Sequence, residues 1–443
     1  MESIIDKLTS LSKRRGFIFQ NSEIYGGLAS TWDYGPIGAE LKKNIKDYWW
    51  NHHVHMRDDI VALESSILSL NKIWETSGHV QNFSDPLIEC KDCNARFRSD
   101  ALEISKGVCP TLKCLNTSFD DPREFNMMFK TNIGPVVSDS SEIYLRPETA
   151  QGIFVNFENI INTSRKKIPF GVAQIGKAFR NEITTGNFIF RTREFEMMEI
   201  EYFVKPQDNE KYYKEWINNS MEFILSLNID KSNLRLREHE PEDLSHYSKG
   251  TTDIEYKFPW GWAELQGIAN RGSFDLDSHS KASSKNFSIF EEATKTRYTP
   301  YVIEPSIGVD RLLLITLLDA YKEEKIENKS ETRTVLKISP KISPIKIAIL
   351  PLSKDQKLSE LSKKIQKDLL SKGDLGKIEY DETQSIGRRY RRQDEIGTPL
   401  CITIDFDSLE DNGVTIRNRD SMLQERVNLD SLHETLKKTI KDY

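Results

Sequence analysis

The chain has 443 residues, a length that indicates two or three domains rather than one. Hydrophobic residues make up 37% and aromatic residues 10%, which excludes a disordered chain, and the net charge of -6 gives no general sign of a nucleic-acid partner. Neither an apolar stretch of about 18 residues nor a basic-then-apolar leader is present, so we expect a cytoplasmic protein without a membrane partner.

In chain order, the first predicted elements are a helix and a strand. Apolar residues recur at helical spacing over residues 37–51, which predicts an amphipathic helix, and residues 60–68 predict a strand. Residues 84–140 then lose all sustained periodicity and contain two Asp-Pro pairs and four cysteines. We interpret this segment as an insertion in the first domain.

The middle of the chain predicts further strands and a buried helix. Residues 170–204 contain two strand-like runs around a polar loop at 183–187, which is the pattern of a long antiparallel hairpin. Residues 260–268 and 301–306 add strands, and residues 308–321 are nearly all apolar, which favours a buried helix.

A smaller domain is predicted at the C-terminal end. Residues 322–345 are rich in Lys and Glu and contain Ser-Pro pairs, so we expect a connector. Residues 345–350 and 400–406 then predict strands with a helical stretch between them. This alternation is typical of a small α/β domain.

Two arginine-bearing segments indicate a nucleotide site. Arg180 stands in Phe-Arg-Asn-Glu at 179–182, and Arg311 ends Glu-Pro-Ser-Ile-Gly-Val-Asp-Arg at 304–311. A guanidinium binds two phosphate oxygens in a planar fork, so we expect Arg180 at an α-phosphate, where charge grows when a carboxylate attacks. Phe195 offers a flat face for adenine, and Arg311 either covers the other side of the ring or binds the γ-phosphate.

Strand alternation sorts the candidate side chains onto faces. Four residues share one face of the strand that begins at Arg193: Phe195, Met197, Glu199 and Glu201. Arg180 and Glu182 share a face of the partner strand, and Glu304 and Ser306 share one on another strand. Taken alone, Arg-x-Glu is typical of a surface ion pair and a single Phe of a core. The two segments occur together and in order ahead of an apolar helix, which favours the nucleotide site.

These two segments resemble motifs 2 and 3 of the class II aminoacyl-tRNA synthetases. Four further stretches resemble the homodimeric type of glycyl-tRNA synthetase: residues 74–79, 145–152, 251–270 and 304–311. The resemblance extends from about residue 14 to residue 426. The helix at 37–51 and the strand at 60–68 occupy the place of motif 1, without its usual proline.

The resemblance implies a mixed α/β fold of the α+β type in two domains. Residues 1–340 would form the class II catalytic domain, an antiparallel sheet flanked by helices, with the insertion at about 84–140. Residues 341–443 would form an α/β anticodon-binding domain with a mixed sheet. The implied reaction is the ATP-dependent activation of glycine to glycyl-adenylate, followed by transfer to the 3′ end of tRNA(Gly), in a homodimer.

Family resemblance also implies the ATP contacts. They are Arg180, Asn181 and Glu182; Phe190, Arg191, Thr192, Arg193, Glu194 and Phe195; and Glu264, Leu265, Gly308, Val309, Asp310 and Arg311. Of these, Arg180, Glu264 and Arg311 would be catalytic. Glu264 would help to bind the Mg²⁺ that bridges the phosphates, because magnesium takes one or two carboxylates together with phosphate oxygens. Without the resemblance, Glu264 is equally an ordinary strand carboxylate.

Glycine has no side chain to hold, so a selective pocket must bind its ammonium with carboxylates and refuse a β-carbon. The resemblance implies contacts at Arg98, Glu148, Phe195, Glu196, Met197, Met198, Glu199, Glu304, Pro305, Ser306, Ile307 and Gly308. Glu199 lies four residues beyond Phe195, about 13 Å along a strand, which suits the two ends of one adenylate. The alternative for Glu148 is a carboxylate at a helix N-terminus.

Four cysteines indicate a metal site. Cys90, Cys93, Cys109 and Cys114 have the spacing C-x2-C-x15-C-x4-C, which fits a structural zinc with four thiolates. The second gap is longer than the usual two residues, and four cysteines without metal are the alternative.

A basic run near the C-terminus indicates RNA binding. Arg388, Arg389, Arg391 and Arg392 surround Tyr390, and residues 385–399 resemble the anticodon-binding domain of class IIa synthetases. Guanidiniums and a stacking ring suit a tRNA loop. The alternative is a solvated helix face paired with acids.

Two other functions compete with this interpretation. The chain could be a class II synthetase for serine, threonine or proline, but Glu148, Glu304 and Ser306 have the glycine-type arrangement. It could also be a silent relative that serves as an RNA- or DNA-binding accessory subunit. Such a protein should lose the acids and arginines of the nucleotide site, whereas Arg180 and Arg311 are present.

Overall fold

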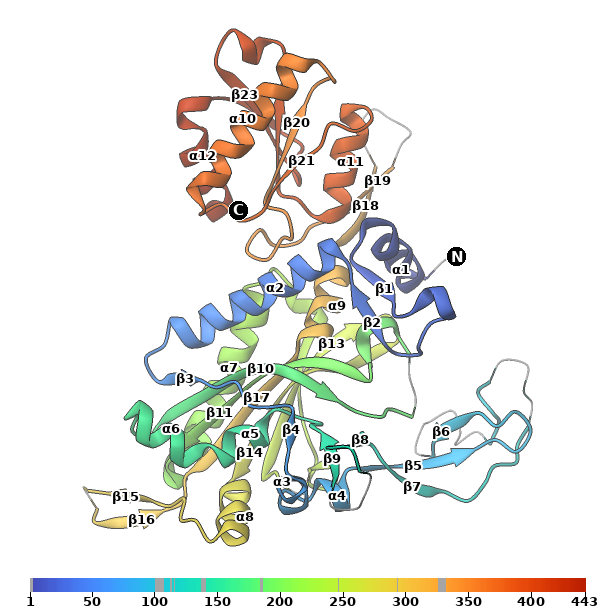
Figure 1. Ribbon diagram of the computed structural model, residues 1–443, viewed down its shortest axis with the longest axis vertical. Helices are drawn as coiled ribbons and strands as arrows, with labels where there is room; N and C mark the ends of the chain where they lie inside the picture. Colours follow the sequence, from blue (N-terminus) through green and yellow to red (C-terminus); the bar gives the residue numbers. More distant parts are fainter. Residues whose placement is uncertain are drawn as a thin grey trace.

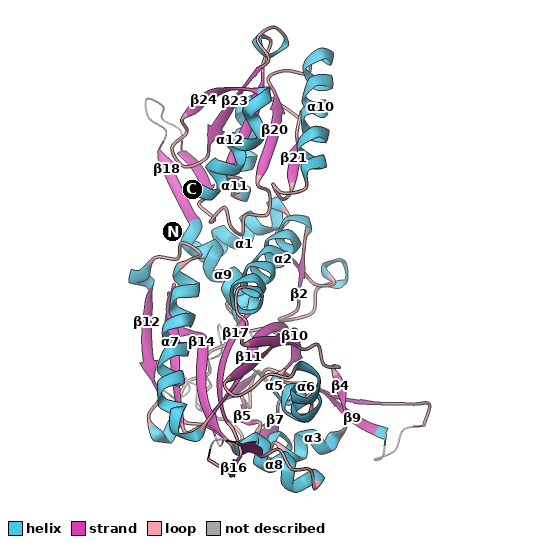
Figure 2. Cartoon of the chain, turned by 90° about the vertical axis from the view of Figure 1, so that its left-hand side faces the viewer, coloured by secondary structure: helices cyan, strands magenta, loops and turns pink. Residues whose placement is uncertain are grey.

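The computed structural model describes residues 3–99, 107–111, 114, 116–136, 141–183, 186–245, 247–292, 294–325 and 332–443. Figures 1 and 2 show two bodies along the long axis, with the C-terminal strands and helices above a larger N-terminal part. In the described part of the chain, no helix combines the length and the apolar character needed to cross a bilayer.

A seven-stranded sheet forms the centre of the larger body. In spatial order its strands are β12 (Leu234–Glu238), β13 (Gly250–Phe258), β14 (Gly261–Gly272), β17 (Tyr301–Gly308), β11 (Glu194–Val204), β10 (Phe170–Phe179) and β3 (Ile60–Ala62). All neighbours are antiparallel except β10 and β3. The predicted hairpin is confirmed, with Phe170 opposite Phe203 and Phe179 opposite Glu194.

Helices cover both faces of this sheet (Figure 1). One face packs against α2 (Pro36–Trp50), α7 (Asn209–Leu225) and α9 (Val309–Ala320), and the other against α5 (Ala150–Val155) and α6 (Phe157–Ser164), with α8 (Phe274–Ser283) beside α5. Alternation along β11 explains the division. Met198 and Ile200 enter the larger core with α7 and α9, whereas Phe203 packs on Phe157 with ring centroids 4.6 Å apart.

The insertion leaves and rejoins the larger body through two paired strands. The order here is α3 (Asn71–Thr76), α4 (His79–Asn82), β5 (Ser84–Glu89), β6 (Arg96–Arg98) and β7 (Arg123–Asn126). β5 pairs antiparallel with both β6 and β7, and Ser84 lies opposite Asn126. The two crossings are therefore adjacent. Part of the predicted insertion, including residues 101–106 and 137–140, lies outside the described residues.

The predicted strand at 60–68 is shorter than expected. Only Ile60–Ala62 belongs to the large sheet, and β4 (Leu68–Ser69) instead joins β9 (Glu142–Leu145) and β8 (Lys130–Asn132). Between these two strands, the backbone of Ser65 is hydrogen-bonded to side chains. Its N–H donates to Gln174 Oε1 at 2.6 Å, and its carbonyl accepts from Arg146 at 2.8 Å. These bonds replace the strand ladder.

Shorter elements and two hairpins also belong to the larger body and its junction. They are α1 (Ile4–Arg15), 3-10 turns at Glu23–Tyr25, Phe188–Phe190, Pro206–Asp208, Lys231–Asn233 and Pro241–Asp243, a π-helical turn at Asn51–His55, the pair β1 (Ile18–Gln20) and β2 (Trp32–Tyr34), and the pair β15 (Ile289–Glu291) and β16 (Thr296–Tyr298). The predicted connector contains an antiparallel strand pair, β18 (Tyr321–Lys325) and β19 (Thr332–Leu336), and β19 buries the apolar side chains of Val335 and Leu336.

The C-terminal domain is a five-stranded mixed sheet with three helices. Its elements are β20 (Ile347–Pro351), α10 (Gln356–Lys372), β21 (Ile378–Tyr380), α11 (Ile386–Ile396), β22 (Leu400–Ile404), β23 (Gly413–Asn418), β24 (Gln424–Asn428) and α12 (Leu429–Asp442). It has its own apolar core. The buried carboxylate of Asp394, on α11, connects the domain to the β18–β19 strand pair through Arg333 at 3.1 Å. Within the domain, the same carboxylate binds Arg417 of β23 at 2.8 Å.

Candidate active site

A cavity of about 600 Å³ lies on the sheet face that carries the odd-numbered side chains of β11. Most of the predicted site residues line it: Glu148, Arg180, Glu182, Phe190, Arg191, Thr192, Phe195, Met197, Glu199, Glu264, Leu265, Glu304, Ser306, Gly308, Asp310 and Arg311. They come from three strands, the segment between β9 and α5, the start of α9 and the segment between β10 and β11. The fold thus brings together segments more than 150 residues apart in the chain.

Nine predicted residues, all of them described, lie outside this lining: Arg98, Asn181, Arg193, Glu194, Glu196, Met198, Pro305, Ile307 and Val309. Successive side chains on a strand point to opposite faces. Glu196 and Met198 therefore point away from the cavity, Glu196 to Lys46 at 2.9 Å and Met198 into the core. The prediction that these two side chains contact glycine is wrong for this reason.

The same alternation points two side chains of β17 away from the cavity. Pro305 and Ile307 lie on the face opposite Glu304 and Ser306, and Ile307 belongs to the larger core, as does Val309 at the start of α9. The prediction that the side chains of Pro305, Ile307 and Val309 contact a ligand is therefore wrong as well. Only their backbone can face a ligand in the cavity.

The other outlying residues have partners elsewhere. Arg98 lies in the insertion, 3.2 Å from Asp85, and Glu194 pairs with Lys177 on the surface at 2.7 Å. The guanidinium of Arg193 donates to the carbonyl of Ala29 at 3.0 Å. The N–H of Asn181 donates to the carbonyl of Met127 at 2.7 Å, which ties the loop after β10 to the root of the insertion.

One end of the cavity is acidic. Glu148, Glu199 and Glu304 approach it from three different segments, as the sequence predicts. Glu199 is fixed at both oxygens, because Oε2 accepts from the N–H of Thr149 at 2.9 Å and Oε1 accepts from the hydroxyl of Ser306 at 2.8 Å. The carboxylates are therefore held in place before any cation enters.

A buried arginine that the sequence analysis missed organises these acids. Arg271 is only 1% exposed, and its Nη1 lies 2.6 Å from Glu304 Oε2 and its Nε 2.7 Å from Asp275 Oδ2. Its Nη2 lies 3.9 Å from Glu148 Oε1, and the ring of Tyr247 lies 3.8 Å from its Cζ. It follows directly after the family-like stretch 251–270, so extending that stretch by one residue finds it.

Burial sets the protonation of the acidic end. Glu201 is fully buried beside Glu304, and burial followed by the charge of Glu304 raises its pKa well above the ordinary value. Burial and the neighbouring charges of Glu199 and Glu148 also raise the pKa of Glu304 to about 8, although Arg271 opposes them. This end of the cavity therefore favours the entry of a positive group.

The other end of the cavity is basic and aromatic. The guanidinium of Arg180 lies between two rings, 5.2 Å from Phe83 and 5.3 Å from Phe195, and its Nε donates to the carbonyl of Pro147 at 3.1 Å. The predicted strand position of Arg180 and Glu182 is wrong, because β10 ends at Phe179. Phe83, from the root of the insertion, was not found by the sequence analysis.

Arg311 occupies the opposite side of this end. Its Cζ lies 4.6 Å from the ring of Phe190, and its Nη1 lies 3.3 Å from Glu264 Oε2. The positive charge of Arg311 is the main cause of a lowered pKa for Glu264, so that carboxylate is ionised and available to a cation. Asp253 lines the same cavity and pairs with His239 at 2.7 Å.

Asp310 lines the cavity and also connects several elements through hydrogen bonds. Its Oδ1 accepts from the hydroxyl of Tyr34 and from Lys42 at 2.7 Å, and its Oδ2 accepts from the N–H of Glu196 at 2.9 Å. These bonds join α9, α2, β2 and β11. They hold Arg311, one residue further on, in its orientation.

The four C-terminal arginines differ in exposure. Arg388 is exposed on α11, whereas Arg389 is only 1% exposed and donates to the carbonyls of Thr383, Pro351 and Gln384. The prediction that Arg389 contacts RNA is wrong, because its donors are engaged inside the domain. Arg392 pairs with Asp381, and Arg391 is half-buried.

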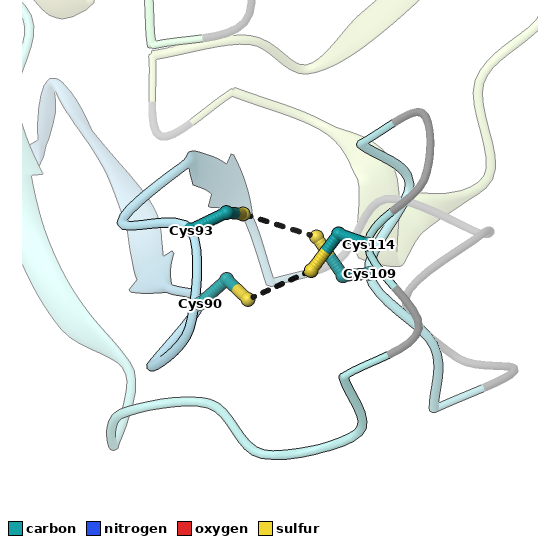
Figure 3. A group of neighbouring side chains, drawn as sticks. All are labelled: Cys90, Cys93, Cys109 and Cys114. Atoms are coloured by element: carbon teal, nitrogen blue, oxygen red, sulfur yellow. Dashed lines mark hydrogen bonds between the residues drawn. The ribbon is translucent and has the colours of Figure 1, made fainter.

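The four cysteines come together in the insertion (Figure 3). Their sulfur atoms all lie within 4.8 Å of one another, with 3.8 Å between Cys90 and Cys114 and 3.6 Å between Cys93 and Cys109. Four sulfurs placed about 2.3 Å from a central ion lie about 3.8 Å apart in a tetrahedron. The cluster therefore has the size of a four-thiolate metal site.

Comparisons with known proteins define the class of protein. Residues 129–320 match the model of the tRNA synthetase class II core domain (G, H, P, S and T), and residues 346–439 match that of the anticodon binding domain. With the antiparallel sheet and the cavity described above, these matches define a class II aminoacyl-tRNA synthetase. The predicted fold class is confirmed.

Full-length relatives narrow the class to one family. Glycine–tRNA ligase of Thermobifida fusca is 51% identical, over 98% of this chain and 97% of its own length. The enzymes of Caldanaerobacter subterraneus and Clostridium acetobutylicum are each 51% identical, over 99% of this chain and 98% and 99% of their own lengths. The chain belongs to the glycine–tRNA ligase family, which confirms the predicted family and ligase class.

The contacts of Arg271 predict a large loss of stability when it is replaced. In Arg271→Met, the buried carboxylates of Glu304 and Asp275 lose their cation, so the free energy of unfolding should fall by about 3–5 kcal/mol. Arg96→Met is the control, because Arg96 is 62% exposed and pairs at the surface with Glu89, itself 21% exposed, and the change should cost at most about 1 kcal/mol. Urea unfolding curves measure both, and equal losses would contradict the role of Arg271.

Proposed function

We propose that this cavity activates glycine with ATP and passes the glycyl group to the 3′ end of tRNA(Gly). The observation that carries the proposal is the polarity of one cavity, with Glu148, Glu199 and Glu304 at one end and Arg180 and Arg311 at the other. An ammonium suits the first end and phosphates the second. Glycyl-adenylate has these groups at its two ends.

Activation forms one bond and breaks another at the α-phosphorus. The carboxylate oxygen of glycine attacks, the bond to the β-phosphate oxygen breaks, and pyrophosphate leaves with that electron pair. Arg180 stabilises the charge that grows on the α-phosphate, and Arg311 binds on the far side of the nucleotide. A ribose hydroxyl of the terminal adenosine then attacks the mixed anhydride, and AMP leaves. No side chain forms a covalent bond, so positioning supplies most of the acceleration.

Magnesium fits the residues present at the phosphate end. Glu264 lines the cavity as an ionised carboxylate next to Arg311, and one or two carboxylates with phosphate oxygens are the usual magnesium ligands. When bound, Mg²⁺ neutralises charge on the departing pyrophosphate. Phe195 and Phe190 provide the apolar rings against which adenine packs.

Selection of glycine follows from acids that are already held in place. Ser306 donates to Glu199 at 2.8 Å, which fixes the two groups beside each other, and we assign them to the contact with the α-carbon. A methyl group pressed into this packed site costs roughly 1–3 kcal/mol, which disfavours alanine. The ammonium is shared among carboxylates, of which Arg271 neutralises only part.

The tRNA requires a second surface, which we assign to residues 341–443, with residues 1–340 as the catalytic domain. Arg388 is exposed on α11, whereas Arg389 is a structural residue. An exposed guanidinium on this helix suits phosphate or base edges of an RNA loop. Arg391 and Arg392 lie on the same helix at intermediate exposure.

A homodimer and a cytoplasmic location complete the proposal. β3 is an edge strand of the large sheet, and Met56, Leu68 and Leu70 are exposed apolar residues close to it in sequence. An open edge flanked by apolar side chains suits an isologous contact with a second copy. None of the five cysteines, all of which are described, forms a disulfide, as expected in a reducing compartment.

Two variants separate activation from tRNA recognition. Arg180→Ala should lower glycine-dependent ATP–pyrophosphate exchange by at least about a hundredfold while tRNA binding persists, because its guanidinium acts on the α-phosphate. Arg388→Ala should lower tRNA charging and leave exchange without tRNA intact. Exchange assays and filter binding measure these effects. The nucleotide assignment fails if Arg180→Ala loses both activities equally, and the RNA assignment fails if Arg388→Ala charges normally.

The raised pKa of Glu304 predicts that glycine binding depends on pH. Deprotonation of Glu304 gives the ammonium a charged partner, and with a pKa of about 8 the ionised fraction rises about eightfold between pH 7 and 8.5. The KM for glycine should therefore fall over this range, while the KM for ATP changes little. In Glu304→Gln this pH dependence should vanish. A glycine KM that stays flat in the unaltered enzyme would refute the assignment.

We further propose that the cysteine cluster binds one structural zinc ion. The proposal is supported by the sulfur–sulfur distances and by the burial of the four side chains, of which two are buried, one is intermediate and one is exposed. Zinc would join Cys90 and Cys93 to Cys109 and Cys114, which come from two separate segments of the insertion.

Metal analysis tests the zinc proposal. The purified protein should contain about one zinc per chain, and Cys93→Ser and Cys114→Ser should lose it, because three thiolates leave the site incomplete. Cys401→Ser is the control, since Cys401 lies in the C-terminal sheet and should leave the zinc content unchanged. Emission spectrometry after dialysis gives the content. Equal zinc in Cys93→Ser and the unaltered chain would show that the cysteines are unmetallated.

A further inference from the structure

His79 is a buried residue of the cavity that the reaction above leaves without a task. It is the first residue of α4, is 4% exposed, and lines the acidic end of the cavity. Its Nε2 lies 3.2 Å from Glu148 Oε2, and its Nδ1 lies 2.8 Å from the hydroxyl of Ser77. Both ring nitrogens are therefore engaged, and the second contact fixes the direction of the first.

The ring of His79 is also held by packing. It meets Trp74 edge-on at 5.5 Å and Phe83 at 5.5 Å in a tilted arrangement. The side chain of Asn126 donates to the carbonyl of His79 at 3.5 Å and to that of Val80 at 3.1 Å. Because Asn126 ends β7, the strand that leaves the insertion, both crossings of the chain meet at this histidine.

Glu148 depends on this contact. Its Oε1 accepts from Gln151 at 3.0 Å, and Arg271 is 3.9 Å away, whereas Oε2 lies nearest to His79. Burial by itself raises the pKa of this carboxyl, yet the pKa lies well below its ordinary value because His79 and then Arg271 stabilise the ionised form. A carboxylate with one oxygen bonded on each side has a single orientation.

We propose that His79 is a positioning residue that aims Glu148 at the ammonium of glycine, so that the amino-acid pocket is completed from the root of the insertion. The proposal rests on the proposed role of Glu148 in binding glycine. His79 touches the carboxylate and not the substrate. Its loss should weaken glycine binding selectively, because the ATP end of the cavity relies on Arg180 and Arg311.

A pair of variants separates hydrogen bonding from packing. His79→Phe keeps a ring between Trp74 and Phe83 but removes both nitrogens, and should raise the KM for glycine about tenfold while the KM for ATP stays within about twofold. His79→Gln restores an N–H that can reach Glu148 and should recover most of the loss. If His79 were purely structural, His79→Phe would instead lower kcat without a selective change in the KM for glycine, and His79→Gln would not rescue it.

A double-variant cycle tests whether His79 acts through Glu148. Glu148→Gln alone should raise the KM for glycine, and adding His79→Phe should raise it no further. If Glu148→Gln leaves glycine binding unchanged, the proposed pocket itself is wrong. If Glu148→Gln weakens binding but His79→Phe does not, or if the two effects add in full, only the positioning role is overturned.

A further variant covers the case in which His79→Phe does not fold. Ser77→Ala removes the hydroxyl that orients Nδ1 and leaves the ring in place, so it should raise the KM for glycine severalfold at an unchanged melting temperature. An unchanged glycine KM in Ser77→Ala would overturn the proposal.

Discussion

The bond network of Arg271 is the interaction on which the active site depends. Several carboxylates gather on one face of the sheet, and a cluster of buried negative charges is unstable without a cation. Arg271 supplies one positive charge from a fully buried position and reaches Glu304 and Asp275 directly. Because it neutralises only part of the negative charge, the pocket stays folded and still attracts an ammonium. The stability of the pocket and its affinity for glycine thus both follow from this partial neutralisation of the negative charge.

The rest of the molecule positions the two ends of the cavity against this network. Alternation along β11 sends Glu199 to the cavity and Met198 to the core, so one strand both anchors the fold and presents the ligand-binding acids. Asp310 joins α9 to α2 and β11, which orients Arg311 at the opposite end. The sheet therefore positions Glu199 and Glu304, while α9, held by Asp310, positions Arg311.

Much of the fold could be predicted from the sequence because its signals are local. The hairpin of β10 and β11, the apolar helix α9 and the C-terminal α/β alternation all follow from periodicity. The site residues on alternating positions could also be sorted by face, as Phe195, Met197 and Glu199 show. Residues such as Glu196 and Met198 were assigned to the site because a motif names consecutive positions, while a strand uses every second one.

What could not be predicted depends on contacts between distant segments. Arg271 and His79 lie next to or within stretches that resemble the family, but their roles have no local signal, since these roles arise from acids that lie 33 and 69 residues away, Glu304 and Glu148. The burial of Arg389 likewise depends on a distant segment, because the guanidinium donates to the carbonyl of Pro351 at the end of β20 as well as to that of Gln384 just before α11. The pairing of Ser84 with Asn126 has a consequence for the history of the chain. Because the insertion departs and returns at neighbouring points of one strand pair, the segment beyond those points can be exchanged, lengthened or deleted as a cassette, and a short turn would close the gap while the seven-stranded sheet kept its connectivity.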